Sequence, residues 1–227
     1  MNKATSGIGV IMLATTLVLG GCKKAEQPGA GATGTALGEQ IVVDPEVTGG
    51  VGEAGNVTLS PASRAPQAVA AARKSAAELS GGLAALPDAI KGSAAELAQA
   101  AAQAAQASPA ARAARTDCSA KVQYSRYWAK KLPAEFPLYP QGAVQEAAGI
   151  DAEGCRLRVV SFGTAVPSED VIAFYNTLAR KGGYSAEYRL DGSDRVLGGR
   201  KQGQAYVVYA RKQANGVTEV DLVVSGK

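Results

Sequence analysis

Apolar and polar residues alternate in the C-terminal part of the chain, as they do in strands that bury one face of a sheet. Between Cys155 and Phe162, the positions Cys, Leu, Val and Ser alternate with Arg, Arg, Val and Phe, so this segment is predicted to be a strand. Glycine-containing pairs, of which Asn215-Gly216 is the strongest hairpin signal, separate the later strands. The predicted strands cover residues 143–148, 155–162, 184–190, 196–201, 204–213 and 217–224.

The spacing of apolar residues changes to that of a helix after the second strand. Glu169 and Asp170 stand at the start of this helix, where carboxylates favour the positive end of its dipole, and Gly182-Gly183 end it. One helix packed on one face of a small antiparallel sheet is the expected architecture, so the predicted fold class is α+β. The apolar stripe expected to face the sheet consists of Val171, Phe174, Tyr175 and Leu178.

A lead-in of aromatic, basic and proline residues precedes the first predicted strand. Its side chains fit one side of a short helix and fit an extended segment equally well, so both interpretations stay open. The residues concerned are Val122, Tyr124, Tyr127, Trp128 and Lys131.

Alanine, the best helix former, dominates residues 67–107. Apolar positions in this segment follow the 3-4 spacing of a coiled-coil seam, but Gly81-Gly82, Pro87 and Gly92 interrupt a continuous helix. A seam made mostly of alanine also buries little area. We therefore expect residues 64–116 to form a broken, partly solvated helical spacer, with an oligomeric coiled coil as the alternative.

Large side chains are absent from the first half of the chain, because all twelve Phe, Trp and Tyr residues lie between Tyr124 and Tyr209. A segment without aromatic residues buries little area per residue, so the packed core is expected in residues 117–227. Residues 22–63 are rich in Gly, Ala, Thr and Val and have no sustained period, which predicts a flexible tether.

The first 21 residues have the layout of a secretory signal. Lys3 precedes an apolar run over residues 8–19, which is shorter than the ~20 residues of a transmembrane helix. The run ends in Leu19-Gly20-Gly21-Cys22, which resembles the lipobox of bacterial lipoproteins. An ordinary cleaved signal followed by a chance cysteine is the alternative, but no Ala-x-Ala site closes the run.

The lipobox resemblance implies cleavage before Cys22 and fatty chains on its sulfur and amino group; no cofactor or metal is expected besides this covalent lipid. Two or three chains hold a protein stably in a bilayer, because each buried methylene contributes about 0.8 kcal/mol. Lys23 stands where an Asp would imply retention in the inner membrane. For a host with two membranes, the resemblance therefore implies an outer-membrane anchor facing the periplasm, with membrane lipid as one partner.

A second resemblance covers residues 132–224. The segments LPAEFPLYPQGAV, Phe162-Gly163-Thr164 and PSEDVIAFYNTLARKGGY resemble a class of small exported bacterial domains that carry a YPGA element, an F-x-T strand end and a VIxFY helix. The chain departs from this class by inserting Gln141 into the first element and by placing Tyr184 where a Trp is usual. The resemblance implies an α+β fold and export, and it implies no activity or site because most members have no known function.

Cys118 and Cys155 remain as a pair if Cys22 is lipidated. In an oxidising periplasm such a pair is expected to form a disulfide, and two free thiols are the alternative. Because the chain has no histidine and only these two further cysteines, a zinc site is not expected.

The composition excludes several kinds of chemistry. The lack of histidine removes His-based triads and imidazole acid–base catalysis, and Ser161 and Ser168 have no expected base partner. The net charge of +4 is spread thinly, so nucleic acid is not an expected partner. The chain is therefore not expected to be an enzyme.

A weakly basic surface remains as a candidate binding face. Arginines on neighbouring strands would receive an acidic glycan, a lipid headgroup or an envelope protein if they lie together on the uncovered face of the sheet. An ordinary solvated face is the alternative. These arginines are Arg156, Arg158, Arg200 and Arg211.

The expected function is that of a membrane-anchored lipoprotein that presents a small, non-enzymatic binding or envelope-assembly domain in the periplasm. The alternative is a structural envelope tether that oligomerises through the helical spacer. The expected organisation is a signal peptide over residues 1–21, a tether over 22–63, the spacer over 64–116 and an α+β domain over 117–227.

Overall fold

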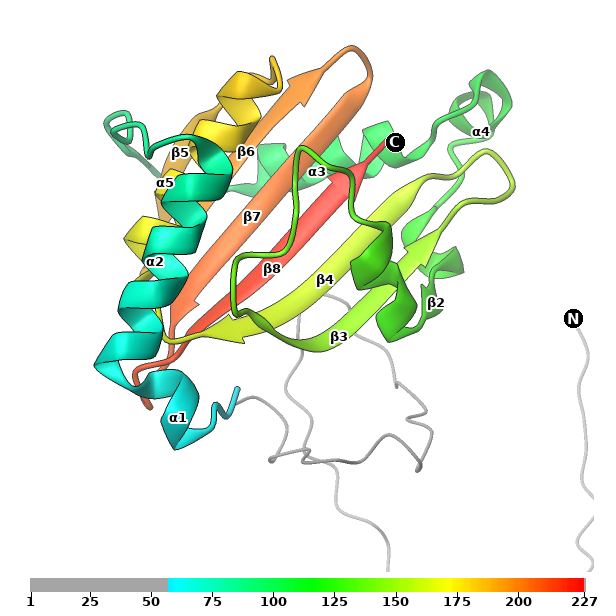
Figure 1. Ribbon diagram of the computed structural model, residues 1–227. Helices are drawn as coiled ribbons and strands as arrows, with labels where there is room; N and C mark the ends of the chain where they lie inside the picture. Colours follow the sequence, from blue (N-terminus) through cyan, green and yellow to red (C-terminus); the bar gives the residue numbers. More distant parts are fainter. Residues whose placement is uncertain (1–56, 227) are drawn as a thin grey trace, which may run out of the picture. The chain divides into compact units, whose positions relative to one another are not determined.

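An eight-stranded sheet forms the centre of the fold (Figure 1). The computed structural model describes residues 57–226, so the predicted signal peptide, Cys22 and the tether up to residue 56 lie outside the described residues. The strands follow the order β1-β5-β6-β7-β8-β4-β3-β2; β1 pairs with β5 in parallel, and the other neighbours pair antiparallel. Their bounds are Ile90–Lys91 (β1), Gln123–Tyr124 (β2), Ala143–Ile150 (β3), Leu157–Thr164 (β4), Glu187–Asp191 (β5), Asp194–Lys201 (β6), Gln204–Lys212 (β7) and Thr218–Ser225 (β8).

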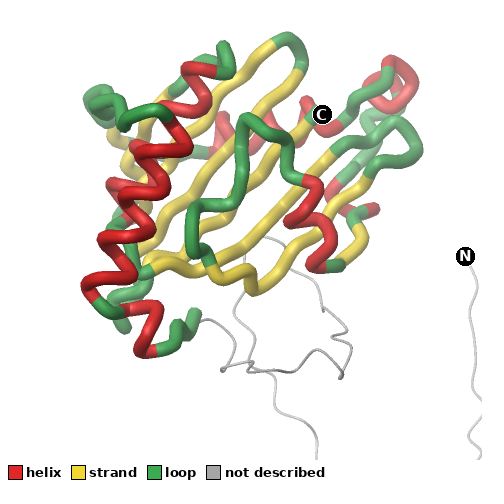
Figure 2. The backbone as a smooth tube through the Cα atoms, viewed as in Figure 1, coloured by secondary structure: helices red, strands yellow, loops and turns green. Residues whose placement is uncertain are grey.

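Helices lie on both faces of this sheet (Figures 1 and 2), which confirms the α+β fold class. We call the side covered by α2 and α5 the front face and the side covered by α3 the back face. The helical segments are α1 (Pro61–Arg64), α2 (Pro66–Ser80), α3 (Ala95–Ala105), α4 (Pro109–Ala113), α5 (Ser168–Lys181) and the 3-10 helices η2 (Ser119–Lys121) and η3 (Arg126–Lys131).

The six predicted strands correspond to β3 through β8, with ends that shift by up to a few residues. In β4, Val160 and Phe162 are fully buried on the front face and Val159 and Ser161 point to the back, as the alternation predicts. The β7–β8 hairpin turns at the predicted Asn-Gly pair, where Gly216 has a φ of 81° that few other residues adopt without strain.

The lead-in segment combines the two interpretations that its sequence left open. Gln123 and Tyr124 are extended and pair with β3 as the edge strand β2. The chain then turns into η3, which lies on the front face over β3 and β4 (Figure 1). Leu132 follows in extended conformation, as the preference of a residue before proline requires.

Two helices cover the front face, where the sequence predicted one. Helix α5 has the predicted bounds, and three of its four predicted stripe residues are fully buried while Leu178 is partly buried. Helix α2 lies beside α5, and its Ala72 and Ala76 join the same hydrophobic core. An ion pair of 2.5 Å between Arg73 and Asp170 links the two helices.

Helix α3 covers part of the back face over β6, β7 and β8. Its Leu97 and Ala101 pack against Val196 and Val207 of the sheet. Gly198 permits this contact, because a Cβ at that position would lie 3.0 Å from Leu97 Cδ1.

Residues 64–116 are broken into separate helices and are partly exposed, as predicted, but they do not form a spacer separate from the sheet. This segment covers both faces of the sheet and belongs to one compact unit with residues 117–226. The physical reason is that small alanine side chains let a helix approach a sheet closely, while the aromatic and branched residues of the sheet supply the bulk of the core.

The last part of the predicted tether is also held by the domain. Val57 and Leu59 are buried against Val217. The backbone N–H of Val57 donates to Gln213 Oε1 at 3.0 Å, and Asn215 Nδ2 donates to the Val57 carbonyl at 2.8 Å. The chain therefore enters the described domain beside the β7–β8 turn.

The predicted disulfide between Cys118 and Cys155 is present. Both cysteines are buried, and their Cα atoms lie 5.6 Å apart. Cys155 also forms an isolated β-bridge with Gln106, just after α3. The disulfide thus joins the segment that follows α4 to the start of β4.

Candidate functional site

The four arginines proposed as one binding face do not lie together, so that prediction is wrong. Arg158 points to the front face and is only 5% exposed. Arg200 and Arg211 lie on the back face, at opposite ends of the β6–β7 pair. Arg156 precedes β4 and is exposed. Two effects separate them. Successive side chains of a strand point to opposite faces of the sheet, and the arginines also lie at different positions along their strands.

Arg158 is instead the centre of a buried hydrogen-bond network. Its Nη1 donates to the carbonyls of Ile150 at 3.2 Å and Leu157 at 3.0 Å, and its Nε donates to the Lys131 carbonyl at 3.3 Å. Its Nη2 forms an ion pair of 2.5 Å with Asp151. A buried guanidinium is costly unless its donors are satisfied, so this network fixes the positions of the segments that it joins.

Trp128 lies against the same part of the sheet. The Arg158 guanidinium is 4.7 Å from the centroid of the indole, which is the range of a cation–π contact. Gly149 is opposite Arg158 in the β3–β4 register, and a Cβ there would lie 2.6 Å from Trp128 Cδ2. The absence of a side chain at residue 149 therefore lets the indole rest on the backbone of β3.

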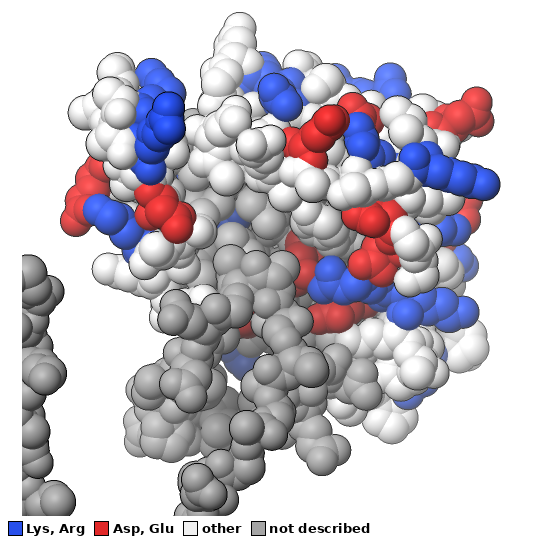
Figure 3. Space-filling view, turned by 180° about the vertical axis from the view of Figure 1, so that it is seen from behind, with Lys and Arg blue, Asp and Glu red and all other residues white. Residues whose placement is uncertain are grey.

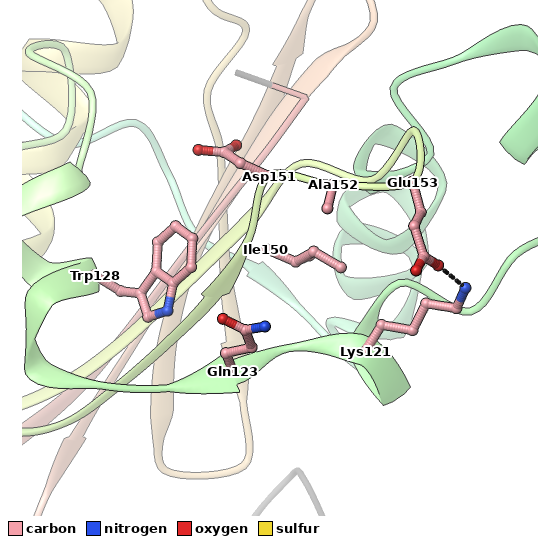
Figure 4. Close-up of a pocket in the computed structure, with 7 residues that line it drawn as sticks. All are labelled: Lys121, Gln123, Trp128, Ile150, Asp151, Ala152 and Glu153. Carbon is pink, nitrogen blue, oxygen red and sulfur yellow. Dashed lines mark hydrogen bonds and ion pairs between the residues drawn. The ribbon is translucent and has the colours of Figure 1, made fainter.

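A surface hollow of about 390 Å³ opens beside Trp128 (Figure 4). In the view of Figure 4, Trp128 lies on one side, the Lys121–Glu153 ion pair lies on the other, and Ile150 lies between them. The hollow therefore has one apolar surface, the Trp128 indole, and a polar rim. Its lining consists of Lys121, Gln123, Trp128, Ile150, Asp151, Ala152 and Glu153.

Exposed aromatic and basic side chains continue from the hollow along η3. Tyr124 is 45% exposed and Tyr127 is 54% exposed, which is unusual for such large side chains. Lys131 Nζ lies 5.2 Å from the centroid of the Tyr127 ring. We call this area the η3 surface; it consists of Arg126, Tyr127, Lys130 and Lys131, all of which are exposed. Tyr124 pairs with Ala148 of β3 and therefore lies toward the back face, outside this surface.

The three cations of the η3 surface are not paired with carboxylates in the described part of the chain. Within residues 57–226, none of Arg126, Lys130 and Lys131 forms an ion pair with a carboxylate. Cations that are exposed and unpaired attract anions from solution, and aromatic neighbours strengthen such contacts. The η3 surface is therefore suited to an anionic partner.

A second polar group of side chains lies on the back face. Arg211 pairs with Asp221 and Glu219, and Ser161 Oγ donates to Asp221 at 2.6 Å. Burial and the neighbouring Asp221 raise the pKa of Glu146 above its ordinary value. Figure 3 looks from this side and shows basic and acidic side chains intermixed over the part of the face that is visible.

The Ser161–Asp221 contact differs from the expectation that Ser161 has no base partner. Asp221 is already engaged by Arg211, which holds its carboxylate in place. The two contacts use different oxygens of the carboxylate, Oδ1 for Ser161 and Oδ2 for Arg211, so Asp221 links β4 and β7 across β8.

The hollow and the η3 surface were not recognised as a site from the sequence. The aromatic and basic residues from Tyr124 to Lys131 were visible as a cluster, and this cluster was the available signal. The contribution of Arg158 and Asp151 was hidden, because they reach Trp128 only through the pairing of β3 with β4.

In the described part of the chain, no helix is long and apolar enough to cross a membrane. Residues 57–226 also contain no group of three or more His, Cys, Asp or Glu side chains placed to hold a metal ion. Comparison with known proteins found no matching family model, no matching curated protein and no matching solved structure.

Proposed function

We propose that the chain is an exported lipoprotein whose domain binds an anionic component of the cell envelope and catalyses no reaction. Fatty chains on Cys22 anchor it to a membrane, in a host with two membranes the outer one, and the domain faces the periplasm. The sequence Leu19-Gly20-Gly21-Cys22 supports the anchor. The hollow and the η3 surface support the binding role.

One observation carries the binding role. Three exposed cations, which have no ion-pair partner in the described chain, lie on the same short helix as Trp128. The indole of Trp128 is in turn held in place by its contacts with Gly149 and Arg158. A surface that is fixed before binding loses little conformational entropy when a partner arrives. The cations provide attraction at a distance, and the rigid aromatic surface provides contact area.

The alternative function, a structural tether that oligomerises through residues 64–116, has less support than the binding function. Four small or apolar residues of its proposed seam are buried within the domain itself and are therefore not free to pair with a second copy. They are Ala72, Ala76, Leu97 and Ala100.

The anchor is tested on the native protein by fractionation and mass spectrometry. We expect the mature chain to begin at Cys22, to carry fatty chains there and to sediment with membranes. The Cys22→Ala variant is expected to appear in the soluble fraction. An unmodified Cys22 in the wild-type protein contradicts the anchor.

The binding role is tested by co-sedimentation of the protein with isolated envelope fragments. The triple variant Arg126→Glu, Lys130→Glu and Lys131→Glu is expected to bind at least about a hundredfold more weakly, because each cation near an anionic surface contributes about 1 kcal/mol. Binding of the wild-type protein is also expected to weaken as salt is raised.

A matched control removes the same amount of charge elsewhere on the surface. Lys91, Arg115 and Arg200 are exposed residues outside the η3 surface, and a triple change of these residues to Glu gives the same net charge. We expect this control to retain most of the binding. Equal loss in both triple variants would show that bulk charge alone determines binding, and it would contradict the proposed surface.

A further inference from the structure

We propose that the hollow beside Trp128 is a subsite for an uncharged saccharide ring of an envelope glycan. This inference rests on the proposed binding function and names the class of ligand that the site takes. It assigns the hollow to the sugar ring and the η3 surface to the anionic groups that the same glycan carries.

The charges around the hollow cancel, which favours an uncharged ligand there. Lys121 is paired with Glu153, and Arg158 is paired with Asp151. Each rim charge thus already has a partner of opposite sign, so an anion or a cation entering the hollow would displace an existing ion pair. A polyhydroxyl ligand needs no such exchange, because the carboxylate oxygens of an ion pair retain lone pairs that accept hydrogen bonds.

The distribution of apolar and polar atoms also matches a sugar ring. Trp128 offers a flat apolar surface, which suits the C–H groups on one face of a pyranose, whereas Ile150 is only 6% exposed and adds little to it. Gln123 and Asp151 lie on the rim and offer planar groups with defined donor and acceptor directions. A wholly apolar ligand would contact little apolar surface in the hollow. It would also bury the polar groups of the rim without giving them hydrogen bonds, which is unfavourable.

The size of the hollow agrees with a short piece of glycan. Its volume of about 390 Å³ lies near the lower end of the 300–1,000 Å³ typical of small-molecule sites. It is open at the surface, so a ring inside it can continue into a chain outside it. The neighbouring cations of the η3 surface can then bind carboxylate or phosphate groups along that chain.

Arg158 acts as a positioning residue for this subsite. It holds Asp151 by an ion pair, it stacks on Trp128, and its donors tie together the ends of η3 and β3. It is buried and does not reach the ligand itself. The hollow is therefore formed before the ligand binds.

The chain contains a single tryptophan, so its fluorescence reports on the hollow directly. The full chain, purified in mild detergent, is titrated with the uncharged tetramer of N-acetylglucosamine and with a hyaluronan tetramer, which contains uronic acid. We expect saturable changes in emission with both, and tighter binding of the hyaluronan tetramer at low salt only. A response to the hyaluronan tetramer alone would overturn the assignment of the hollow to an uncharged ring.

Variants locate the binding within the molecule. Gln123→Ala removes a rim amide and is expected to weaken binding of the uncharged tetramer at least threefold. The matched control Gln145→Ala changes an exposed glutamine of β3 outside the hollow and is expected to leave binding unchanged. Equal effects of the two variants would place the saccharide elsewhere and would overturn the proposal.

The outcome also separates this inference from the proposed function. If neither tetramer changes the tryptophan emission while envelope fragments still bind in a manner that depends on the η3 surface, the saccharide subsite is wrong and the envelope-binding role stands. If the envelope fragments also fail to bind, both are wrong.

Discussion

Leu97 of α3 lies directly over Gly198 of β6, where even one added carbon atom would come within 3.0 Å of the leucine Cδ1. This contact shows how an alanine-rich helix docks on a sheet: one large side chain fits where the sheet has none. The flanking alanines then approach β7 and β8 closely. Helix α3 is therefore part of the folding unit.

The Leu97→Ala variant is expected to lower the free energy of unfolding by about 2–3 kcal/mol, because it deletes a buried side chain and leaves a cavity. Leu97 is 7% exposed, whereas Leu79 of α2 is 54% exposed. Leu79→Ala is therefore the matched control and is expected to change stability by less than about 0.5 kcal/mol. Urea denaturation measures both variants, and equal small effects would mean that α3 does not dock in solution.

The boundary of the folding unit is tested with two fragments. Residues 57–227 are expected to unfold in one cooperative transition. Residues 117–227 are expected to lack a stable fold, because the sheet loses Ala72 and Ala76 from its front face and Leu97 from its back face. Dispersed NMR spectra and a cooperative transition for the shorter fragment would contradict this.

Much of the sheet could be predicted from the sequence. The period-two pattern located β3 through β8, and the acidic start and glycine end located α5. These signals are local, since they depend on which side of a strand or helix is buried and on the backbone preferences of single residues.

The role of residues 64–116 could not be predicted in the same way. Ala76 is fully buried, but nothing in its own segment shows this, because the large side chains around it come from α5 and the sheet. The same holds for the candidate site. The buried state of Arg158 depends on η3 crossing above it and on Gly149 across the β3–β4 ladder, and both are long-range relationships.

Loss of the disulfide is expected to be costly. Cys118 and Cys155 are 37 residues apart in the sequence. Without the bond, the unfolded chain gains conformational entropy, and in the loop-closure account this lowers the free energy of unfolding by about 3–4 kcal/mol. The double variant Cys118→Ala/Cys155→Ala should show this loss in urea denaturation. Reduction of the wild-type protein should reproduce it, and a variant as stable as the oxidised protein would contradict the prediction.

The stability of the fold is expected to depend on the ionisation of Glu146. Burial raises the pKa of this carboxyl above its unfolded value of 4.5, and Asp221 adds to the effect. The folded state therefore binds the proton more tightly, and the resulting stability is complete below the unfolded pKa and is lost as pH rises through the folded pKa. Glu146→Gln cannot ionise, so relative to wild type it should gain stability as pH rises above the unfolded pKa of 4.5.

The pKa of Glu153 is shifted in the opposite direction to that of Glu146. Its hydrogen bond and charge interaction with Lys121 lower its pKa below the ordinary value. Its contribution is therefore present above the unfolded pKa and is lost as pH falls. Urea denaturation at several pH values should show opposite trends for Glu146→Gln and Glu153→Gln, and parallel trends would contradict the assignment.

Val57 is fastened beside the β7–β8 turn, where its side chain meets Gly163, whereas the hollow lies beside Ile150, opposite Leu157. These two places are at opposite ends of β4, which at about 3.3 Å per residue separates them by roughly 20 Å. If the chain before Val57 is tethered as proposed and a partner binds at the hollow, a force between these two places acts lengthwise along the strands. The backbone hydrogen bonds between the strands would then be loaded together in shear rather than broken one after another.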